Sequence, residues 1–323
     1  VTRGILVDLD NEAELAALLG HELGHVNARH AAQRQGQAMV AQVAVAGANI
    51  AAAGSEWGTL VNLGSQLGAS ALLSSYSRDN EREADALGQD YMVRAGYPAQ
   101  GMVGLHELLV RGEKSQPNLL QTMFATHPMS RERRDTAARL ASERYGASRS
   151  SSDGRERFMD NIASLRRIKP TIEACQQGET ALSGKRYAVA EDQFKQALKR
   201  TPADYAANLR MAQCLQAQDR SHDALPYAES AKRIYPQEAQ AHKLAGVLSL
   251  SMRDPGAAYA SLDQYDRLLP GDAGVTFLKG VSQEGMGNRQ EAARLYANYL
   301  RISQQGQAAQ YAQTRLRGWG YLR

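Results

Sequence analysis

The sequence predicts a mainly α-helical chain with two parts, a helical amino-terminal domain and a carboxy-terminal α-solenoid. Two observations carry this prediction. Residues 21–25 read His-Glu-Leu-Gly-His within a segment of helical periodicity, and prolines and alanines recur every 34 residues in the second half. The length of 323 residues suits two domains that each bury a core of their own.

The amino-terminal motif places two metal-binding side chains on one face of a helix. Asn11 and Glu14 have the spacing of a capping box that begins this helix. His21 and His25 are four residues apart, so both imidazoles can reach one ion. Glu22 lies beside them and points at the open side of that ion. This pattern is typical of zinc peptidases, in which the glutamate is the general base.

Three more residues of this helix carry expectations. Gly20 and Gly24 each cost about 1 kcal/mol relative to alanine inside a helix, so we expect another element to approach closely there. His30 lies about 140° around the helix from His25. We therefore expect His30 to be a packing or hydrogen-bonding residue and not a third ligand.

A second predicted helix supplies the third ligand. Asp79 or Asn80 is expected to cap it. Glu81 and Asp85 share one face, so Glu81 can bind the metal while Asp85 orients a ligating imidazole. Glu83 points elsewhere. The alternative interpretation is an acidic, solvated first turn that favours the helix dipole.

The two motifs together resemble the gluzincin peptidases that include the CAAX prenyl proteases and the HtpX-like bacterial proteases. The similarity covers roughly residues 1–140 and continues to the Thr-His-Pro of residues 126–128. It implies a zincin-type helical metallopeptidase domain with a small β-sheet and one Zn²⁺ ion per chain. The resemblance assigns zinc binding to His21, His25 and Glu81, and base catalysis to Glu22.

Two residues are candidates for stabilising the oxyanion of the reaction. His127 and Arg78 both carry hydrogen-bond donors near the motif segments. In relatives of this kind the counterpart of His127 lies on a loop over the metal, where it could instead occupy the fourth metal position and hold the enzyme latent. A third interpretation makes His127 a turn residue before Pro128 without a catalytic part.

The second half contains an internal repeat with the 34-residue period of tetratricopeptide repeats. We expect four helix pairs, at 171–204, 205–238, 239–272 and 273–306, and a capping helix at 307–323. Proline is expected to end the second helix of a pair. The residues in register are Pro202, Pro236 and Pro270; Ala190, Ala224, Ala258 and Ala292; and the small residues Gly178, Ala212, Gly246 and Gly280.

The remaining boundaries follow from composition. Residues 1–147 are expected to form the metallopeptidase domain, and 148–170 a linker and connecting helix, since 148–154 are rich in serine. The first residues look like an interior piece of the family's domain, so we expect an amino-terminal part to be missing. That part would hold the edge strand that aligns substrate.

Charge and apolar patterning exclude some classes of function. The net charge is +4, and the arginines between 131 and 167 are accompanied by acids with few aromatics, which indicates a solvated surface and not a nucleic-acid site. The apolar residues 38–53 are interrupted by polar ones, so we expect them to pack near the active site or touch a membrane surface. Cys175 and Cys214 are either a disulfide or two buried free thiols.

The two halves together resemble the BepA-like periplasmic zinc metalloproteases of Gram-negative bacteria. This resemblance implies a zinc-dependent endopeptidase that cleaves misfolded or stalled envelope and outer-membrane proteins. Its repeats would recruit substrate or the outer-membrane assembly machinery, with a chaperone-like contribution. The alternatives are an adaptor or holdase with a vestigial metal site, and a peptidase unrelated to the envelope. Retention of Glu22 together with the ligands argues against the vestigial site.

Overall fold

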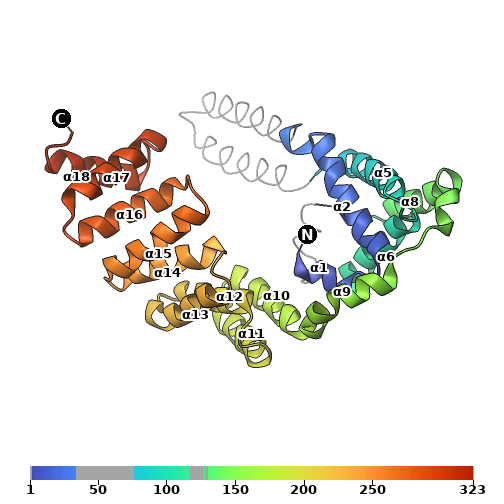
Figure 1. Cartoon of the computed structure of the whole chain (residues 1–323), viewed down its shortest axis with the longest axis horizontal. Helices are drawn as coiled ribbons and strands as arrows, with labels where there is room; N and C mark the ends of the chain where they lie inside the picture. Colours follow the sequence, from blue (N-terminus) through green and yellow to red (C-terminus); the bar gives the residue numbers. More distant parts are fainter. Residues whose placement is uncertain (1, 34–75, 116–126, 128–129, 323) are drawn as a thin grey trace, which may run out of the picture. The chain divides into compact units, whose positions relative to one another are not determined.

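The computed structural model describes residues 2–33, 76–115, 127 and 130–322. The chain divides into two compact units, Val1–Lys169 and Pro170–Arg323 (Figure 1). The regular elements in the described ranges are all helices, which confirms a mainly α-helical protein. The expected small β-sheet is not found among these residues, and the apolar segment 38–53 lies outside them. No helix in the described part of the chain is both long and apolar enough to span a membrane.

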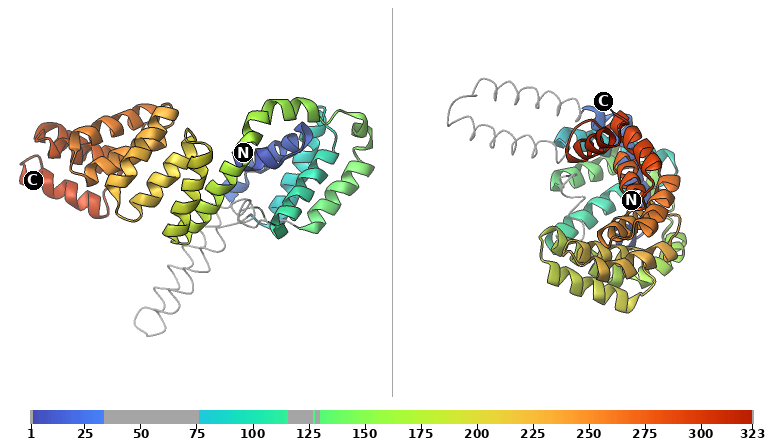
Figure 2. Two further views of the ribbon diagram at one scale, coloured as in Figure 1. Left: turned by 90° about the horizontal axis from the view of Figure 1, so that it is seen from below. Right: turned by 90° about the vertical axis from the view of Figure 1, so that its left-hand side faces the viewer.

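The first unit is built around the helix that carries the His-Glu-Leu-Gly-His motif, α2. This helix packs against α5 and α6, and α8 packs against the same two helices (Figures 1 and 2). Leu18, Met92, Met102 and Leu105 are buried between them. The elements of this unit are α1 (Arg3–Asp8), α2 (Glu12–Asn27), α5 (Arg78–Arg94), α6 (Gln100–Ser115), α8 (Arg131–Glu143), the 3₁₀ helix η1 (Gly146–Ser150) and α9 (Arg155–Arg167).

Side-chain caps begin both motif-bearing helices. Asn11 Oδ1 accepts the backbone N–H of Glu14 at 2.9 Å, as the capping-box spacing predicts for α2. The prediction that Asp79 or Asn80 caps α5 is wrong. Ser77 is the cap, because its Oγ accepts the Asn80 N–H at 3.1 Å while Asn80 Oδ1 accepts the Ser77 N–H at 3.3 Å.

The close approach expected at the two helix glycines is confirmed. A Cβ atom built on Gly20 would lie 2.6 Å from the carbonyl oxygen of Gly88, and one on Gly24 would lie 2.7 Å from that of Ala84. The backbones of α2 and α5 are therefore in direct contact, with no side chain between them at these points. This contact brings the faces of the two motifs together.

The stretch expected as a linker and connecting helix, 148–170, contains the end of η1, α9 and the start of α10. It packs on the first unit. Ser148 Oγ accepts the Ala99 N–H at 3.0 Å, Asp153 O accepts the Ala13 N–H at 3.0 Å, and Phe158 is buried in the core. The boundary between the compact units falls after Lys169, within α10.

The second unit is a stack of helix pairs at the predicted period (Figure 2). The pairs are α10 (Lys169–Ser183) with α11 (Tyr187–Arg200), α12 (Tyr205–Gln216) with α13 (Ser221–Ile234), α14 (Ala239–Ser251) with α15 (Pro255–Leu268), and α16 (Ala273–Gly285) with α17 (Arg289–Ile302), followed by α18 (Gln307–Gly318). Pro202, Pro236 and Pro270 each follow the second helix of a pair. The α-solenoid of tetratricopeptide repeats is thus confirmed.

Complementary side-chain sizes pack the helices of the first and fourth pairs against each other. Gly178 faces the ring of Phe194, and a Cβ atom on this glycine would lie 2.5 Å from that ring. Gly280 faces Tyr296 in the same way, at 2.7 Å. In the second pair both equivalent positions are alanines, which are buried in one core cluster. A glycine in the first helix therefore makes room for a large residue from the second.

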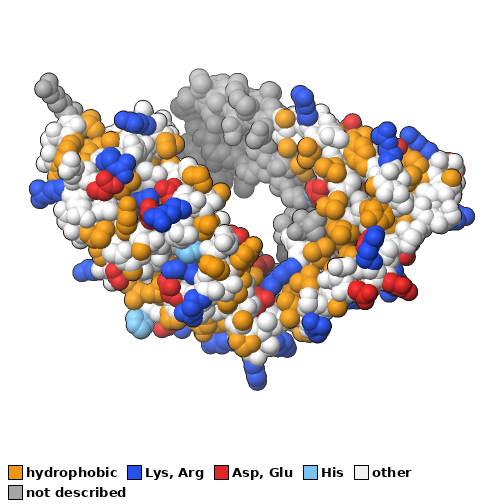
Figure 3. Space-filling model, viewed as in Figure 1, with side chains coloured by type: hydrophobic (Ala, Val, Ile, Leu, Met, Phe, Trp, Pro, Cys, Tyr) orange, Lys and Arg blue, Asp and Glu red, His pale blue; other side chains and the backbone are white. Residues whose placement is uncertain are grey.

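Two further expectations concern surface and cysteines. Basic and acidic side chains are interspersed on the visible face, in line with a solvated charged surface (Figure 3). Cys175 and Cys214 are both buried, and they are not joined by a disulfide. Burial raises the pKa of the Cys214 thiol, which keeps it protonated at neutral pH.

Candidate metal centre

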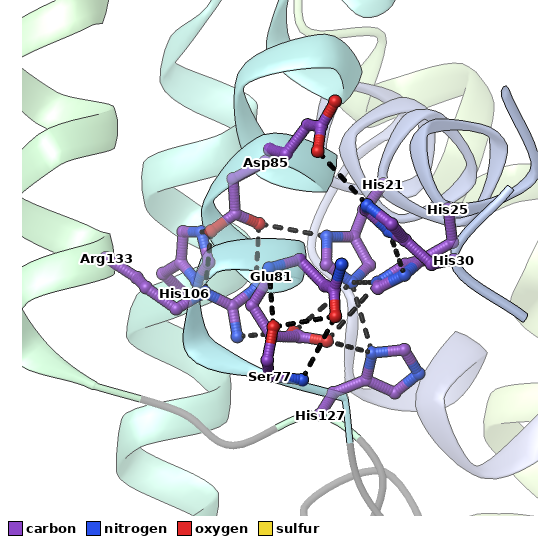
Figure 4. A network of polar contacts seen from close by, with 11 residues as sticks. His21, His25, His30, Ser77, Glu81, Asp85, His106, His127 and Arg133 are labelled. Carbon is purple, nitrogen blue, oxygen red and sulfur yellow. Dashed lines mark hydrogen bonds and ion pairs between the residues drawn. The ribbon is translucent and has the colours of Figure 1, made fainter. Parts of the chain in front are cut away.

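Four side chains from the two motifs and the His127 segment meet at one point of the first unit (Figure 4). The Nε2 atoms of His21 and His25 lie 3.1 Å apart. Glu81 Oε1 lies 3.3 Å from His25 Nε2. His127 Nδ1 lies 3.3 Å from His21 Nε2 and 3.0 Å from Glu81 Oε1. The three expected ligands and the ambiguous histidine thus form one cluster.

The spacing of these atoms fits a tetrahedral metal ion. Bonds of about 2.1 Å in a tetrahedral zinc site place neighbouring ligand atoms roughly 3.4 Å apart. The four separations just given run from 3.0 to 3.3 Å. Three imidazoles and one carboxylate are also the donor types that zinc accepts. The residues present therefore fit the metal that the motif implies.

Asp85 contacts His21 on the side away from the cluster. Its Oδ1 atom lies 2.9 Å from His21 Nδ1, so the carboxylate accepts the Nδ1–H and leaves the Nε2 lone pair for a metal. Burial lowers the pKa of His21 in spite of this hydrogen bond, which favours the neutral imidazole that a metal requires. The geometry matches the orienting role proposed for Asp85.

A buried guanidinium, which sequence reasoning missed, joins the ligand to the orienting carboxylate. Arg133 on α8 is 5% exposed. Its Nη1 lies 2.7 Å from Glu81 Oε2, and its Nε lies 2.6 Å from Asp85 Oδ2. The interpretation of the arginines after residue 131 as a solvated surface is wrong at this position. The only available signal was its place six residues after His127.

The electrostatics of the centre hold both acids ionised. Burial alone would raise the pKa of Glu81, but the neighbouring His127 and His25 side chains and the charge of Arg133 together lower it to about 2. Burial would also raise the pKa of Asp85, yet Arg133 and two histidines hold it well below its usual range. One of these is His106 on α6, whose Nε2 lies 3.4 Å from Asp85 Oδ2 and which the sequence did not indicate.

The remaining candidates lie in different surroundings. Glu22 is partly exposed and forms no hydrogen bond or ion pair with any residue that the structure describes, so its carboxylate is available to a water molecule. Arg78, the first residue of α5, is exposed. In the described ranges Arg133 is the guanidinium that contacts the cluster, so the proposed oxyanion role of Arg78 gains no support.

Sequence reasoning also missed Tyr76. The centroid of its ring lies 4.1 Å from that of the His25 ring.

Fold and centre together define a helical domain of metallopeptidase type. The sequence profile of peptidase family M48 matches residues 1–141, so the first unit carries a peptidase M48 domain, and the expected resemblance is confirmed. The chain is 36% identical over 131 residues to the metalloprotease YcaL of Escherichia coli (strain K12), covering 40% of this chain and 49% of that protein. It is 32% identical over 141 residues to the beta-barrel assembly-enhancing protease of Yersinia pestis, covering 42% and 28%.

The chain therefore spans half or less of the length of these curated relatives. Among solved structures, it is similar to the MamA protein, with 18% identity and a TM-score of 0.44 over 47% of this chain and 84% of that one. It is also similar to YrrB, described as a tetratricopeptide-repeat protein with an unusual peptide-binding site. That similarity has 19% identity and a TM-score of 0.42 over 55% and 89% of the two chains.

Proposed function

We propose that this chain is a zinc-dependent endopeptidase whose metal is held by His21, His25 and Glu81. The observation that carries the proposal is a cluster of four ligand atoms that all lie within 4.8 Å of one another, with four of their separations at 3.0–3.3 Å. The M48 domain and the metalloprotease relatives support it. An intact centre with Glu22 beside it favours an enzyme over an adaptor or holdase with a vestigial site.

Different residues of the chain have different roles in peptide hydrolysis. A bound zinc ion would supply Lewis acidity, which lowers the pKa of water and polarises a peptide carbonyl. Glu22 takes the proton of the attacking water and passes it to the leaving amine. Asp85 and Arg133 hold His21 and Glu81 in place while the charge at the centre changes.

His127 is proposed to keep the enzyme latent. A hydrolytic zinc site uses three protein ligands and keeps its fourth position for water or substrate. In the structure the Nδ1 atom of His127 lies among the ligand atoms, which is the position of a fourth ligand. This geometry favours a plug over an oxyanion donor, so substrate can bind only after His127 moves away.

The first test is Glu22→Gln. This substitution removes the base and keeps every ligand, so the variant should retain about one zinc per chain and lose proteolysis. Metal analysis of the purified protein and digestion of casein measure the two properties. Cleavage by Glu22→Gln at the wild-type rate would refute the mechanism, and a wild-type protein that does not bind zinc would refute the metal assignment.

The physiological substrates are proposed to be misfolded or stalled proteins of the bacterial envelope. The support comes from the relative named beta-barrel assembly-enhancing protease. We propose that the chain acts in the periplasm of a Gram-negative bacterium, where its repeats recruit a client or the outer-membrane assembly machinery and add a chaperone-like activity. Digestion of a stalled outer-membrane barrel protein by the wild type, and not by Glu22→Gln, tests this assignment.

A further inference from the structure

The second metal-ligating histidine has a hydrogen-bonded partner of its own, separate from the Asp85–His21 contact. His25 Nδ1 lies 3.0 Å from Nδ1 of His30, the residue five positions further along the chain. His30 Nε2 in turn lies 3.2 Å from Glu83 Oε2 on α5. Figure 4 shows His30 beside His25, on the side away from His127. The side chain of His30 is fully buried, whereas that of Glu83 is 59% exposed.

The direction of these two hydrogen bonds follows from the chemistry of the Glu83 carboxylate. A carboxylate only accepts, so the contact with Glu83 requires a hydrogen on His30 Nε2. A neutral His30 then has a lone pair on Nδ1 and accepts the Nδ1–H of His25. His25 in this tautomer has its own lone pair on Nε2, the atom that faces the metal position. If the hydrogen bond between His30 and His25 ran in the opposite direction, the hydrogen of neutral His25 would be on Nε2 and would block metal binding.

We propose that His30 and Glu83 are positioning residues that fix the metal-binding tautomer of His25 through this two-step relay. The inference rests on the proposed metal site and deepens it. The buried Asp85 contacts His21 directly. The hydrogen bonds that start at His25 instead pass through His30 and end at the exposed carboxylate of Glu83. The two motif histidines thus have different hydrogen-bonding partners.

Substitutions of His30 separate hydrogen bonding from packing. His30→Leu fills the buried space without an acceptor and should weaken zinc binding by about 10–100-fold, as expected for loss of a residue that orients a ligand. His30→Asn places an amide oxygen near the position of the imidazole Nδ1, so it should restore affinity to within a few-fold of the wild type. Competition with a chromophoric zinc chelator on the full chain measures both.

Substitution of the exposed end tests the relay without disturbing the core. Glu83→Ala should weaken zinc binding several-fold. In the metal-free variant, His25 should exchange between its two neutral tautomers, which ¹⁵N spectra of the histidine side chains would show. Asp79→Ala is the control, because it removes an acid one turn earlier on α5 that forms an ion pair with Arg82. In the His30→Asn background Glu83→Ala should have no additional effect.

The outcomes separate this inference from the proposed function. The inference is wrong if His30→Leu binds zinc as tightly as the wild type, or if Glu83→Ala and Asp79→Ala change affinity and spectra equally. Either result leaves the zinc site of the wild type intact. Absence of zinc binding by the wild type would instead remove the proposed function, while the ¹⁵N spectra of the metal-free protein would still report whether Glu83 sets the tautomer.

Discussion

The carboxylate of Asp85 is shared by side chains from three other helices. It lies 2.9 Å from His21 Nδ1 on α2, 2.6 Å from Arg133 Nε on α8 and 3.4 Å from His106 Nε2 on α6. A solvent-exposed acid on the surface of α5 would have none of these contacts. Asp85 therefore links the orientation of one ligand to the packing of the helices around it.

Asp85→Ala should weaken zinc affinity by about 10–100-fold, because His21 loses the acceptor that fixes its ring. The metal-free domain should stay folded but lose roughly 1–3 kcal/mol of unfolding free energy, because buried Arg133 loses an acidic partner. A chelator titration and a urea melt measure these quantities. Asp90→Ala, which removes a partly exposed acid from the same helix, is the control, and equal affinities of the two variants would contradict the role.

The sign of the effect of His127→Ala identifies the role of this residue. If His127 occupies the fourth position, its removal should raise peptidase activity at saturating zinc, because water and substrate gain access to the ion. An oxyanion donor would instead lose about 10²–10³-fold in rate. Casein digestion with parallel zinc analysis measures this. No change in rate would leave only the turn interpretation.

The proposed ligands and the residue that orients one of them were predictable from the sequence, because they form two pairs that each lie within one helix. His21 and His25, and likewise Glu81 and Asp85, are four residues apart, and helix geometry alone places such pairs on one face. Arg133 and His106 reach the centre through the packing of α8 against α5 and of α6 against α2 and α8. No local spacing encodes that packing, so these two residues could not be predicted.

At the scale of elements, the position of the centre depends on the backbone contact between α2 and α5. A Cβ atom on Gly88 would lie 2.6 Å from the backbone nitrogen of His21. Backbone atoms cannot move aside as a flexible side chain does. The helices would have to separate, and His21 and His25 would move away from Glu81.

Gly88→Ala should therefore weaken zinc binding at least tenfold and destabilise the fold by about 1–3 kcal/mol, the usual cost of overpacking. Zinc titration and thermal unfolding measure these effects. Gly146→Ala is the matched control, since a Cβ atom there meets nothing within 4 Å. Zinc affinity of Gly88→Ala equal to that of Gly146→Ala would show that the contact does not set the geometry of the centre.

The repeats show which features of an element a sequence reveals. The helix pairs were predictable because the same residue types recur at 34-residue intervals. The first helix of each of the four pairs is followed, two or three residues after its end, by a residue with positive φ. Only the last of these is the glycine that usually marks such a turn, so three of the four turns gave no signal. These residues are Lys185, Asp219, Arg253 and Gly287.

At the scale of the whole chain, the two compact units are expected to divide recognition from cleavage. Each helix pair of the second unit contacts mainly its neighbours, which makes the array a separable unit. The centre lies wholly within the first unit. The fragment 170–323 should therefore fold alone and bind an unfolded envelope protein, as circular dichroism and a binding titration would show.

Deletion of the repeats should affect substrates unequally. The fragment 1–169 keeps the centre and should cleave a short unstructured peptide at a rate within a few-fold of that of the full chain. Its cleavage of an unfolded outer-membrane barrel protein should fall by about tenfold or more, because docking on the repeats raises the effective concentration of that client at the centre. Rates measured on both substrates with zinc-loaded protein decide the matter. Equal loss on the peptide and the barrel protein would mean that the repeats support the catalytic domain structurally, and recruitment would have to be abandoned.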